Sequence, residues 1–305
     1  MSPDKQSLKT AATLVETSVA DLDDIYTAAR FSNSLAYFLP MPDTIATLEQ
    51  ELGEKVDAAV PLNTGLSVGR KAVQFRYRTV IVLAFEATKP DEMMKNAWSH
   101  AKDKKWSLPY ARYVDGRQVH SFYLDMWLGM RSAALAAISE SVLAMERLGQ
   151  VPSRILVTGH SMGGGISTLA IMNIVEYLRS TFGSQSPNVA SWARDDQLGA
   201  LLRHITFAEF GASGKEYNLH LNQFYERYSI PAWDFVHPHD FTSRLHLPFL
   251  RAPRGHRYVL PDPAVRPFER EYAAGRHDMP GYMKSMEWLR DNPRKLRSMY
   301  QYGKI

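Results

Sequence analysis

The chain of 305 residues is 45% hydrophobic and 22% charged, a composition typical of a globular protein and not of a disordered or low-complexity one. Its formal net charge of +4 is small for this length and its basic residues are scattered, so we expect no nucleic acid as a partner. There are no cysteines, which excludes disulfides, thiolate metal sites and a cysteine nucleophile.

The N-terminal part of the chain is predicted to be helical. Within residues 1–60 apolar residues recur at three- and four-step spacing, and Pro40 and Pro42 interrupt the pattern. The stretch up to Asp24 is acidic and lacks an apolar core, so it does not resemble a signal peptide. No segment approaches the roughly 18 to 20 apolar residues of a membrane span. We therefore expect a cytoplasmic protein with one domain over residues 1–305.

The middle of the chain begins with two predicted strands. Residues 71–87 contain the runs AVQFRYR and TVIVLAFEA, which predict neighbouring strands. The second run is apolar almost throughout, as expected of a strand that is covered on both faces. Residues 89–115 are mixed, because lysines and prolines alternate with methionines and tryptophans.

An alternation of helices and strands follows. We expect a long helix over Ser121–Leu148, a short apolar strand over Arg154–Gly159 and a helix over Ile166–Thr181. Two later strands are predicted over Thr206–Phe210 and Phe224–Ile230. This order indicates an α/β fold with a mostly parallel central sheet and helices on both faces.

The most informative motif joins the strand before residue 160 to the helix after it. Gly159 and Gly163 flank Ser161 at two positions on either side, in the pattern G-x-S-x-G. A serine on a sharp turn between strand and helix needs glycines there, because other side chains would clash. The turn presents the hydroxyl at the carboxyl end of the strand, where the helix also directs its free N–H groups. Ser161 is therefore predicted to be a nucleophile.

Further motifs lie in order along residues 70–290. They are Ile81–Thr88 (IVLAFEAT), Val119–Tyr123 (VHSFY), Thr158–Gly164 (TGHSMGG), Thr206–Phe207 (TF), Arg227–Val236 (RYSIPAWDFV) and His277–Met283 (HDMPGYM). In content and order they resemble motifs of the class 3 lipases, the fungal-type triacylglycerol lipase family: FRGT, VH-x-GF, TGHSLGG, TFG-x-PR-x-GN, D-x-VP and H-x-M-x-x-Y. Glu86 and Ala87 stand where FRGT has Arg-Gly. The resemblance implies the α/β-hydrolase fold and a hydrolase of carboxylic esters.

Two aspartates compete for the acid of a Ser-Asp-His triad. In this fold the acid follows the nucleophile in the chain, in a loop just after a sheet strand. Asp234 follows the strand predicted over residues 224–230, and its position resembles that of the family's acid. It is therefore the first choice. Asp240, in the stretch HPHDF, is the alternative.

The histidine of the triad has several candidates. Those that follow the acid are His237, His239, His246, His256 and His277. His277 opens a new segment ahead of a helix predicted over Tyr282–Arg290, which would provide a rigid mount for a general base. The resemblance to H-x-M-x-x-Y favours the same residue. We expect His160, next to the nucleophile, to pack beneath the turn.

These assignments predict a mechanism that requires no metal and no cofactor. His277 takes the proton of Ser161 as it attacks the ester carbonyl, and Asp234 stabilises the resulting imidazolium. The backbone N–H of Met162 is predicted to stabilise the oxyanion, and the resemblance implies Thr88 as the second donor. Water then releases the acid from the acyl-enzyme.

The expected partner is a small-molecule ester or a lipid ester such as an acyl glycerol. Residues 89–115 occupy the position of the family's lid, and could form either an amphipathic cover that contacts a lipid surface transiently or a plain surface segment. Two other functions stay open: a non-catalytic, hydrolase-like binding protein, and an acyltransferase that uses the same triad. The sequence predicts no oligomeric state.

Overall fold

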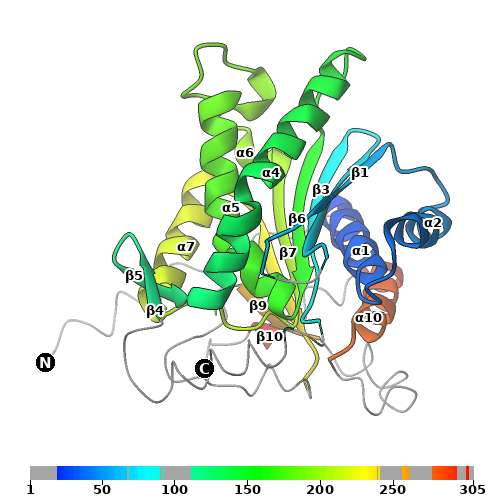
Figure 1. Cartoon of the computed structure of the whole chain (residues 1–305). Helices are drawn as coiled ribbons and strands as arrows, with labels where there is room; N and C mark the ends of the chain where they lie inside the picture. The colour runs from blue at the N-terminus through cyan, green and yellow to red at the C-terminus, as the bar shows by residue number, and fades with distance from the viewer. Residues whose placement is uncertain are drawn as a thin grey trace, which may run out of the picture.

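A single sheet carries the elements that surround the nucleophile (Figure 1). In the computed structural model the described residues are 19–66, 69–89, 92, 111–238, 240, 256–260, 277–293 and 300–301. Among them, eight strands form this sheet in the order β1-β2-β3-β6-β7-β8-β9-β10. Their bounds are β1 Ala58–Leu62, β2 Ala72–Tyr77, β3 Val80–Phe85, β6 Arg154–His160, β7 Leu202–Phe207, β8 Ala232–Val236, β9 Arg257–Val259 and β10 Tyr300–Gln301.

The centre of the sheet is parallel. From β3 through β6, β7 and β8 to β9 every neighbouring pair is parallel, whereas β1, β2 and β10 at the edges pair in the antiparallel sense. All residues of β7 and nearly all of β6 are buried, as expected where helices cover both faces. The prediction of a mostly parallel central sheet between helices is confirmed. Since ligands of such sheets bind beyond the carboxyl ends of the strands, this edge is where a site is expected.

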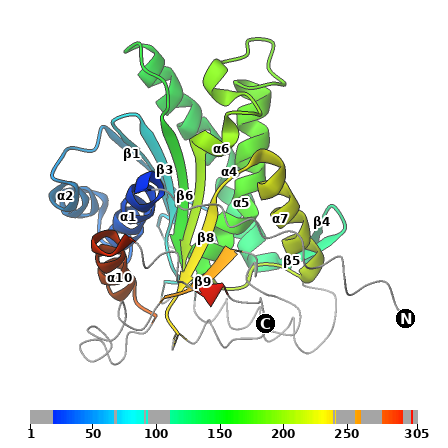
Figure 2. The same cartoon turned by 180° about the vertical axis from the view of Figure 1, so that it is seen from behind.

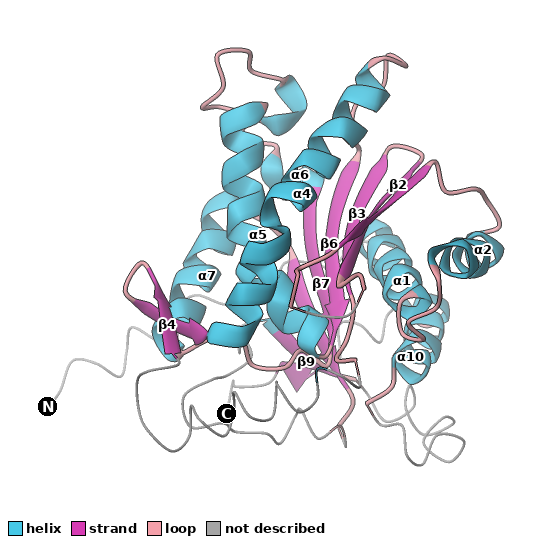
Figure 3. Ribbon diagram, viewed as in Figure 1, coloured by secondary structure: helices cyan, strands magenta, loops and turns pink. Residues whose placement is uncertain are grey.

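The helices divide between the two faces of the sheet (Figures 1 and 2). On one face lie α4 Ser121–Glu146, α5 Met162–Thr181, α6 Leu198–Leu201 and α7 Lys215–Tyr228. On the other lie α1 Val19–Ser34, α2 Met41–Leu52 and α10 Met279–Asp291. Figure 3 shows the sheet edge-on between these two groups. A short hairpin, β4 Ala111–Val114 and β5 Arg117–His120, and a 3-10 turn at Ser191–Ala193 complete the described elements.

Separate hydrophobic clusters hold the two layers to the sheet. Tyr123 and Trp127 of α4 join Ile166 of α5 in the cluster on one face. On the other face Ile25 of α1 joins Met286 of α10. Among the described helices, α4 alone is long and apolar enough by composition to cross a membrane. In the structure 39% of this apolar window is buried, and the buried side chains pack against α5 and the sheet.

Most predicted elements are present, with one informative error. The helical N-terminal segment forms α1, which ends at Ser34, and α2, which has Pro40 at its N-cap and Pro42 in its first turn, while residues 1–18 lie outside the described residues. The strand predicted over residues 224–230 is wrong, because this stretch is the last turns of α7. The buried residues of α7 fall at helical spacing: Tyr217, Leu221, Phe224, Tyr225 and Tyr228. The strand of the sheet begins only at Ala232.

Candidate active site

Ser161 lies on the tight turn between β6 and α5. Its backbone has φ 56° and ψ −122°, a conformation that a residue with a side chain rarely adopts. Backbone hydrogen bonds hold it on both sides: the Ser161 N–H donates to the Phe207 carbonyl at 2.9 Å, and the Ser161 carbonyl accepts from the Phe210 N–H at 3.1 Å and from the Gly165 N–H at 3.2 Å. The end of β7 therefore braces the strained residue that presents the hydroxyl.

The flanking glycines are required by close backbone approach. A Cβ on Gly159 would lie 2.4 Å from the carbonyl carbon of Gly163. One on Gly163 would lie 2.4 Å from the carbonyl oxygen of Phe85, at the end of β3. Both distances are far below a normal van der Waals contact, so neither position accepts a side chain without moving the backbone. The turn thus packs directly against the carboxyl end of the neighbouring strand.

A continuous chain of hydrogen bonds links the serine, a histidine and an aspartate. The Oγ of Ser161 is 2.7 Å from Nε2 of His277. The Nδ1 of His277 is 3.0 Å and 2.9 Å from the two carboxylate oxygens of Asp240. Asp240 is fully buried, whereas the His277 side chain is 22% exposed and Ser161 is 7% exposed. The structure therefore brings together two first choices of the sequence, Ser161 and His277, with the alternative acid.

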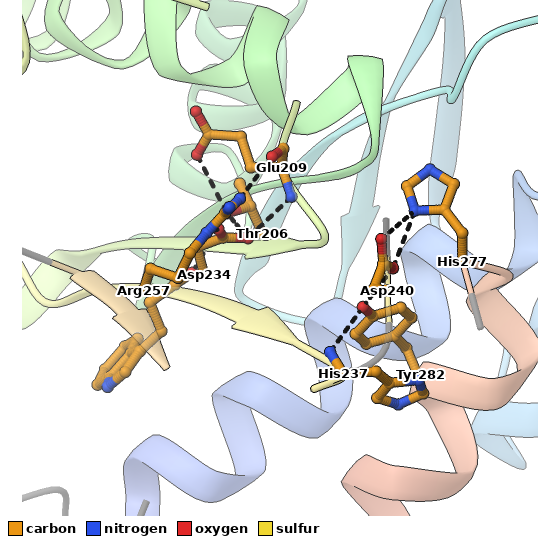
Figure 4. A network of polar contacts seen from close by, with 9 residues as sticks. Thr206, Glu209, Asp234, His237, Asp240, Arg257, His277 and Tyr282 are labelled. Atoms are coloured by element: carbon orange, nitrogen blue, oxygen red, sulfur yellow. Dashed lines mark hydrogen bonds and ion pairs between the residues drawn. The ribbon is translucent and has the colours of Figure 1, made fainter. Parts of the chain in front are cut away.

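Asp234, the first choice for the acid, lies elsewhere, and the predicted position of the acid is corrected accordingly. Its carboxylate accepts a hydrogen bond from Nε of Arg257 at 2.6 Å and another from the Glu209 N–H at 3.0 Å. Figure 4 shows this group apart from the one formed by Asp240 and His277. Asp234 is the middle residue of β8, whereas Asp240 comes after the carboxyl end of the strand.

The wrong strand prediction caused this error. With a strand expected over residues 224–230, Asp234 was placed in the loop that follows a strand, where a triad acid belongs. Because the strand is Ala232–Val236, that loop begins beyond Asp234 and contains Asp240. Asp240 therefore stands in the loop where the rule expects an acid, and Asp234 stands within the strand.

Two residues fix the position of Asp240: Tyr282, for which the sequence predicts no role, and His237, which the sequence offers only as a candidate base. The hydroxyl of Tyr282 donates to Oδ2 of Asp240 at 2.7 Å and accepts from the His237 N–H at 2.9 Å. The His237 ring stacks on Tyr282 with 4.0 Å between centroids, and its carbonyl accepts from the Asp240 N–H at 3.0 Å. Tyr282 belongs to the same motif as His277, which was the signal available in the sequence.

The helix α10 contains Tyr282 and follows directly after His277 and Asp278. It begins at Met279, and the side chain of Asp278 caps it by accepting from the Gly281 N–H at 3.2 Å. Such a cap stabilises the first turn and fixes the direction of the chain that enters it. The predicted rigid mount behind His277 is present, although the helix begins earlier than Tyr282.

The other histidines do not reach the serine in the described structure. His237 packs on Tyr282 and bonds Ser285 through Nε2 at 3.0 Å, and the His256 ring lies edge-on against Tyr225. The His160 ring lies 4.8 Å from that of His277. Burial, followed by the charge that His277 carries when protonated, lowers the pKa of His160 to about 3, so it is neutral near pH 7. His239 and His246 lie outside the described residues.

The predicted oxyanion donors follow the two strand ends at the turn. Met162 is the first residue of α5, directly after Ser161. Thr88 lies just beyond β3, whose last carbonyl contacts Gly163. Their role as donors stays a prediction. Residues 93–110 lie outside the described residues, so the lid hypothesis for 89–115 also stays a prediction, except that this segment ends in β4.

Comparison with known proteins places this geometry in a family. A family model described as lipase (class 3) matches residues 82–246, more than half of the chain. The crystal structure of the lipase from Rhizopus microsporus var. chinensis is 15% identical, with a TM-score of 0.52 over 75% of this chain and 70% of that one. The native Rhizomucor miehei lipase propeptide complex is 14% identical, with a TM-score of 0.53 over 78% and 67%.

A further solved structure has the same fold. It is a triacylglycerol lipase whose catalytic centre is described as a serine protease triad, 17% identical, with a TM-score of 0.52 over 83% of both chains. A search of curated proteins found no significant match. The fold is shared with these α/β-hydrolase lipases, and the family model covers Ser161 and Asp240. The chain is thus a member of the class 3 lipase family.

Proposed function

We propose that this protein hydrolyses carboxylic esters through an acyl-enzyme, with Ser161 as nucleophile, His277 as general base and Asp240 as the acid. The observation that carries the proposal is the unbroken chain from Ser161 Oγ to His277 at 2.7 Å and from His277 to Asp240 at 2.9 Å. Family membership supports the same reaction. Both distances are within the range required for proton transfer between a nucleophile and its base.

The geometry defines the direction of each proton. With Asp240 accepting from Nδ1–H, the other ring nitrogen of His277, Nε2, accepts the Ser161 proton. As Oγ attacks the ester carbonyl, the proton moves to Nε2, and the carboxylate stabilises the imidazolium. The same proton then passes to the departing alkoxide, which leaves as the alcohol. Water repeats the sequence on the acyl-enzyme and releases the carboxylic acid.

For the substrate we propose an ester of a lipid, such as an acyl glycerol. The support is membership of a lipase family and the fold shared with triacylglycerol lipases. A series of p-nitrophenyl esters from acetate to long acyl chains tests the class. A lipase should show kcat/KM rising with chain length and a rate increase above the concentration at which the ester disperses as an interface. A preference for acetate would instead indicate a small soluble ester.

Labelling with a fluorophosphonate tests the catalytic proposal itself. The probe should attach to Ser161 in the wild-type protein and fail to attach to Ser161→Ala. Turnover of a short ester should disappear in the same variant, while the cooperative thermal unfolding is retained. A wild-type protein that is folded yet neither labelled nor active would favour the non-catalytic, hydrolase-like alternative.

A further inference from the structure

A group of buried charges lies beside the segment that follows β3. Its members are Arg70, Lys71, Glu86, Lys89 and Glu92. Nζ of Lys71 is 2.6 Å from a carboxylate oxygen of Glu92, and both side chains are completely buried. Glu86 is paired with Arg70 at 2.5 Å and with Lys89 at 2.8 Å. Burying charges is costly unless they are paired, and the burial of these five near the turn that carries Ser161 calls for a functional explanation.

The cluster ties residues 86–89 and Glu92 to Lys71. The Glu86 N–H donates to the Lys71 carbonyl at 2.9 Å, which extends the β2–β3 ladder past its last residues. Glu92 accepts a second hydrogen bond from the Lys89 N–H at 2.8 Å. Lys71 itself donates from Nζ to the carbonyl of Ala87 at 2.5 Å. The Lys71 ammonium therefore binds both the Ala87 carbonyl and the Glu92 carboxylate.

The bond to Ala87 orients Thr88. The Ala87 carbonyl and the Thr88 N–H belong to one planar peptide unit, and no described peptide bond is cis, so the two groups point in opposite directions. With the oxygen held by Lys71, the N–H is directed away from the cluster. Within the described part of the chain this N–H has no acceptor. The positive charge of the Lys71 ammonium, bonded to the carbonyl oxygen, also polarises the amide and makes its N–H a stronger donor.

The peptide between Ala87 and Thr88 directly follows residues that lie against the turn carrying Ser161. The carbonyls of Phe85 and Glu86 contact Gly163, which stands two positions after Ser161. We propose that Lys71 is a positioning residue for the oxyanion site, because its ammonium fixes and polarises the peptide that presents the Thr88 N–H. The inference rests on the proposed function. Donors fixed in advance stabilise the developing charge without reorganising during the reaction.

The charge state of Lys71 connects this role to pH. Burial lowers the pKa of Lys71 to about 8, although Glu92 and then Glu86 act to raise it, while Lys89 lowers it further. Above that pH Lys71 loses its proton, and the Ala87 carbonyl is no longer bonded to a cation. The kcat of the wild-type protein should therefore fall on the alkaline side near pH 8, for a reason unrelated to the base of the triad.

Lys71→Met tests the inference with p-nitrophenyl butyrate as substrate. We expect kcat to fall by about 10- to 100-fold with KM within twofold, since removal of one oxyanion donor costs about 100- to 1,000-fold. The alkaline fall of kcat near pH 8 should disappear. Arg78→Gln, at the turn between β2 and β3, removes a basic side chain paired with Glu54 from the same hairpin and should change neither quantity.

Two more variants separate positioning from stability. Lys71→Met leaves Glu92 as an unpaired buried charge, so the double variant Lys71→Met/Glu92→Gln should fold better and still show the loss in kcat. Glu92→Gln alone keeps the ammonium and removes the charge that raises its pKa, so the alkaline fall should move to lower pH. That second readout does not depend on Lys71→Met folding.

The outcomes distinguish the inference from the proposed function. An active wild-type protein whose Lys71→Met variant keeps wild-type kcat, or keeps the alkaline fall, would overturn the inference and leave the function intact. An unmoved alkaline fall in Glu92→Gln would do the same. A folded wild-type protein that neither turns over the ester nor reacts with a fluorophosphonate would remove both.

Discussion

Asp234 and Asp240 stand close together in the chain, yet their carboxylates have different partners. Asp240 contacts the imidazole of His277, whereas Asp234 neutralises Arg257, and both of these acids are buried. One side chain is placed to orient a base, and the other is placed to compensate a buried guanidinium. The same substitution at the two positions should therefore have opposite consequences for catalysis and for stability.

Asp240→Asn should lower kcat by about 10,000-fold, because an amide holds the His277 ring in the wrong tautomer and leaves the imidazolium unsupported. Asp234→Asn should retain activity per folded molecule but lower the free energy of unfolding by about 3 to 5 kcal/mol, because Arg257 loses its buried partner. Active-site titration and chemical denaturation measure the two effects. The reverse pattern would return the role of the acid to Asp234.

Among the elements, the junction of β6 and α5 depends on its contact with β3. The backbone of Gly163 and the carbonyl of Phe85 approach each other so closely that no side chain fits between them. Rigid secondary structure on both sides leaves little freedom to accommodate an added atom. The position of the nucleophile is thus defined by strand packing as well as by the turn itself.

Gly163→Ala should abolish turnover and lower the free energy of unfolding by about 3 kcal/mol or more, because the methyl group would lie 2.4 Å from the Phe85 oxygen. Gly214→Ala, at the N-cap of α7, is the matched control, since its Cβ would come no closer than 3.3 Å to another atom, the Cβ of Gln118. Thermal denaturation and ester hydrolysis of both variants provide the comparison. Equal effects would mean that packing at the turn is not the cause.

The elements also show where sequence patterns suffice and where they fail. The strand and helix around Ser161 were predictable, because a continuous apolar run and glycine spacing leave few alternatives. The end of α7 is ambiguous in the sequence, because YERYSI contains tyrosine and isoleucine, which strands favour, and only the preceding residues reveal a 3.6-residue period. The contacts of Lys71 with Ala87 and Glu92 join segments whose proximity depends on tertiary structure, so no local pattern predicts them.

For the molecule as a whole, buried histidines should set its tolerance of acid. His204 is fully enclosed between Ser167 and Tyr225, and burial lowers its pKa to about 3, the same direction and value as for His160. In the unfolded chain a histidine binds its proton near pH 6.5. Between these values the unfolded state holds more protons than the folded state, so stability declines as the pH falls.

The free energy of unfolding should decrease below pH 6.5 by about 1.4 kcal/mol per pH unit for each such histidine, until the pH nears 3. His204→Gln should make this dependence shallower by one proton, whatever its cost in stability at pH 7. Denaturant titrations at pH 7, 6, 5 and 4 measure the slope. A slope in His204→Gln equal to that of the wild-type protein would contradict this explanation.

The packing of α10 against α1 has a consequence for any fragment cut from this protein. Tyr282 and Met286 of α10 pack with Ile25 of α1, and Tyr26 bonds Glu287. The stretch that matches the family model, residues 82–246, contains Ser161 and Asp240 but neither of these helices. A fragment trimmed to that stretch would lack His277, the proposed proton acceptor, together with α1, whose packing against α10 we expect to hold that histidine near Ser161.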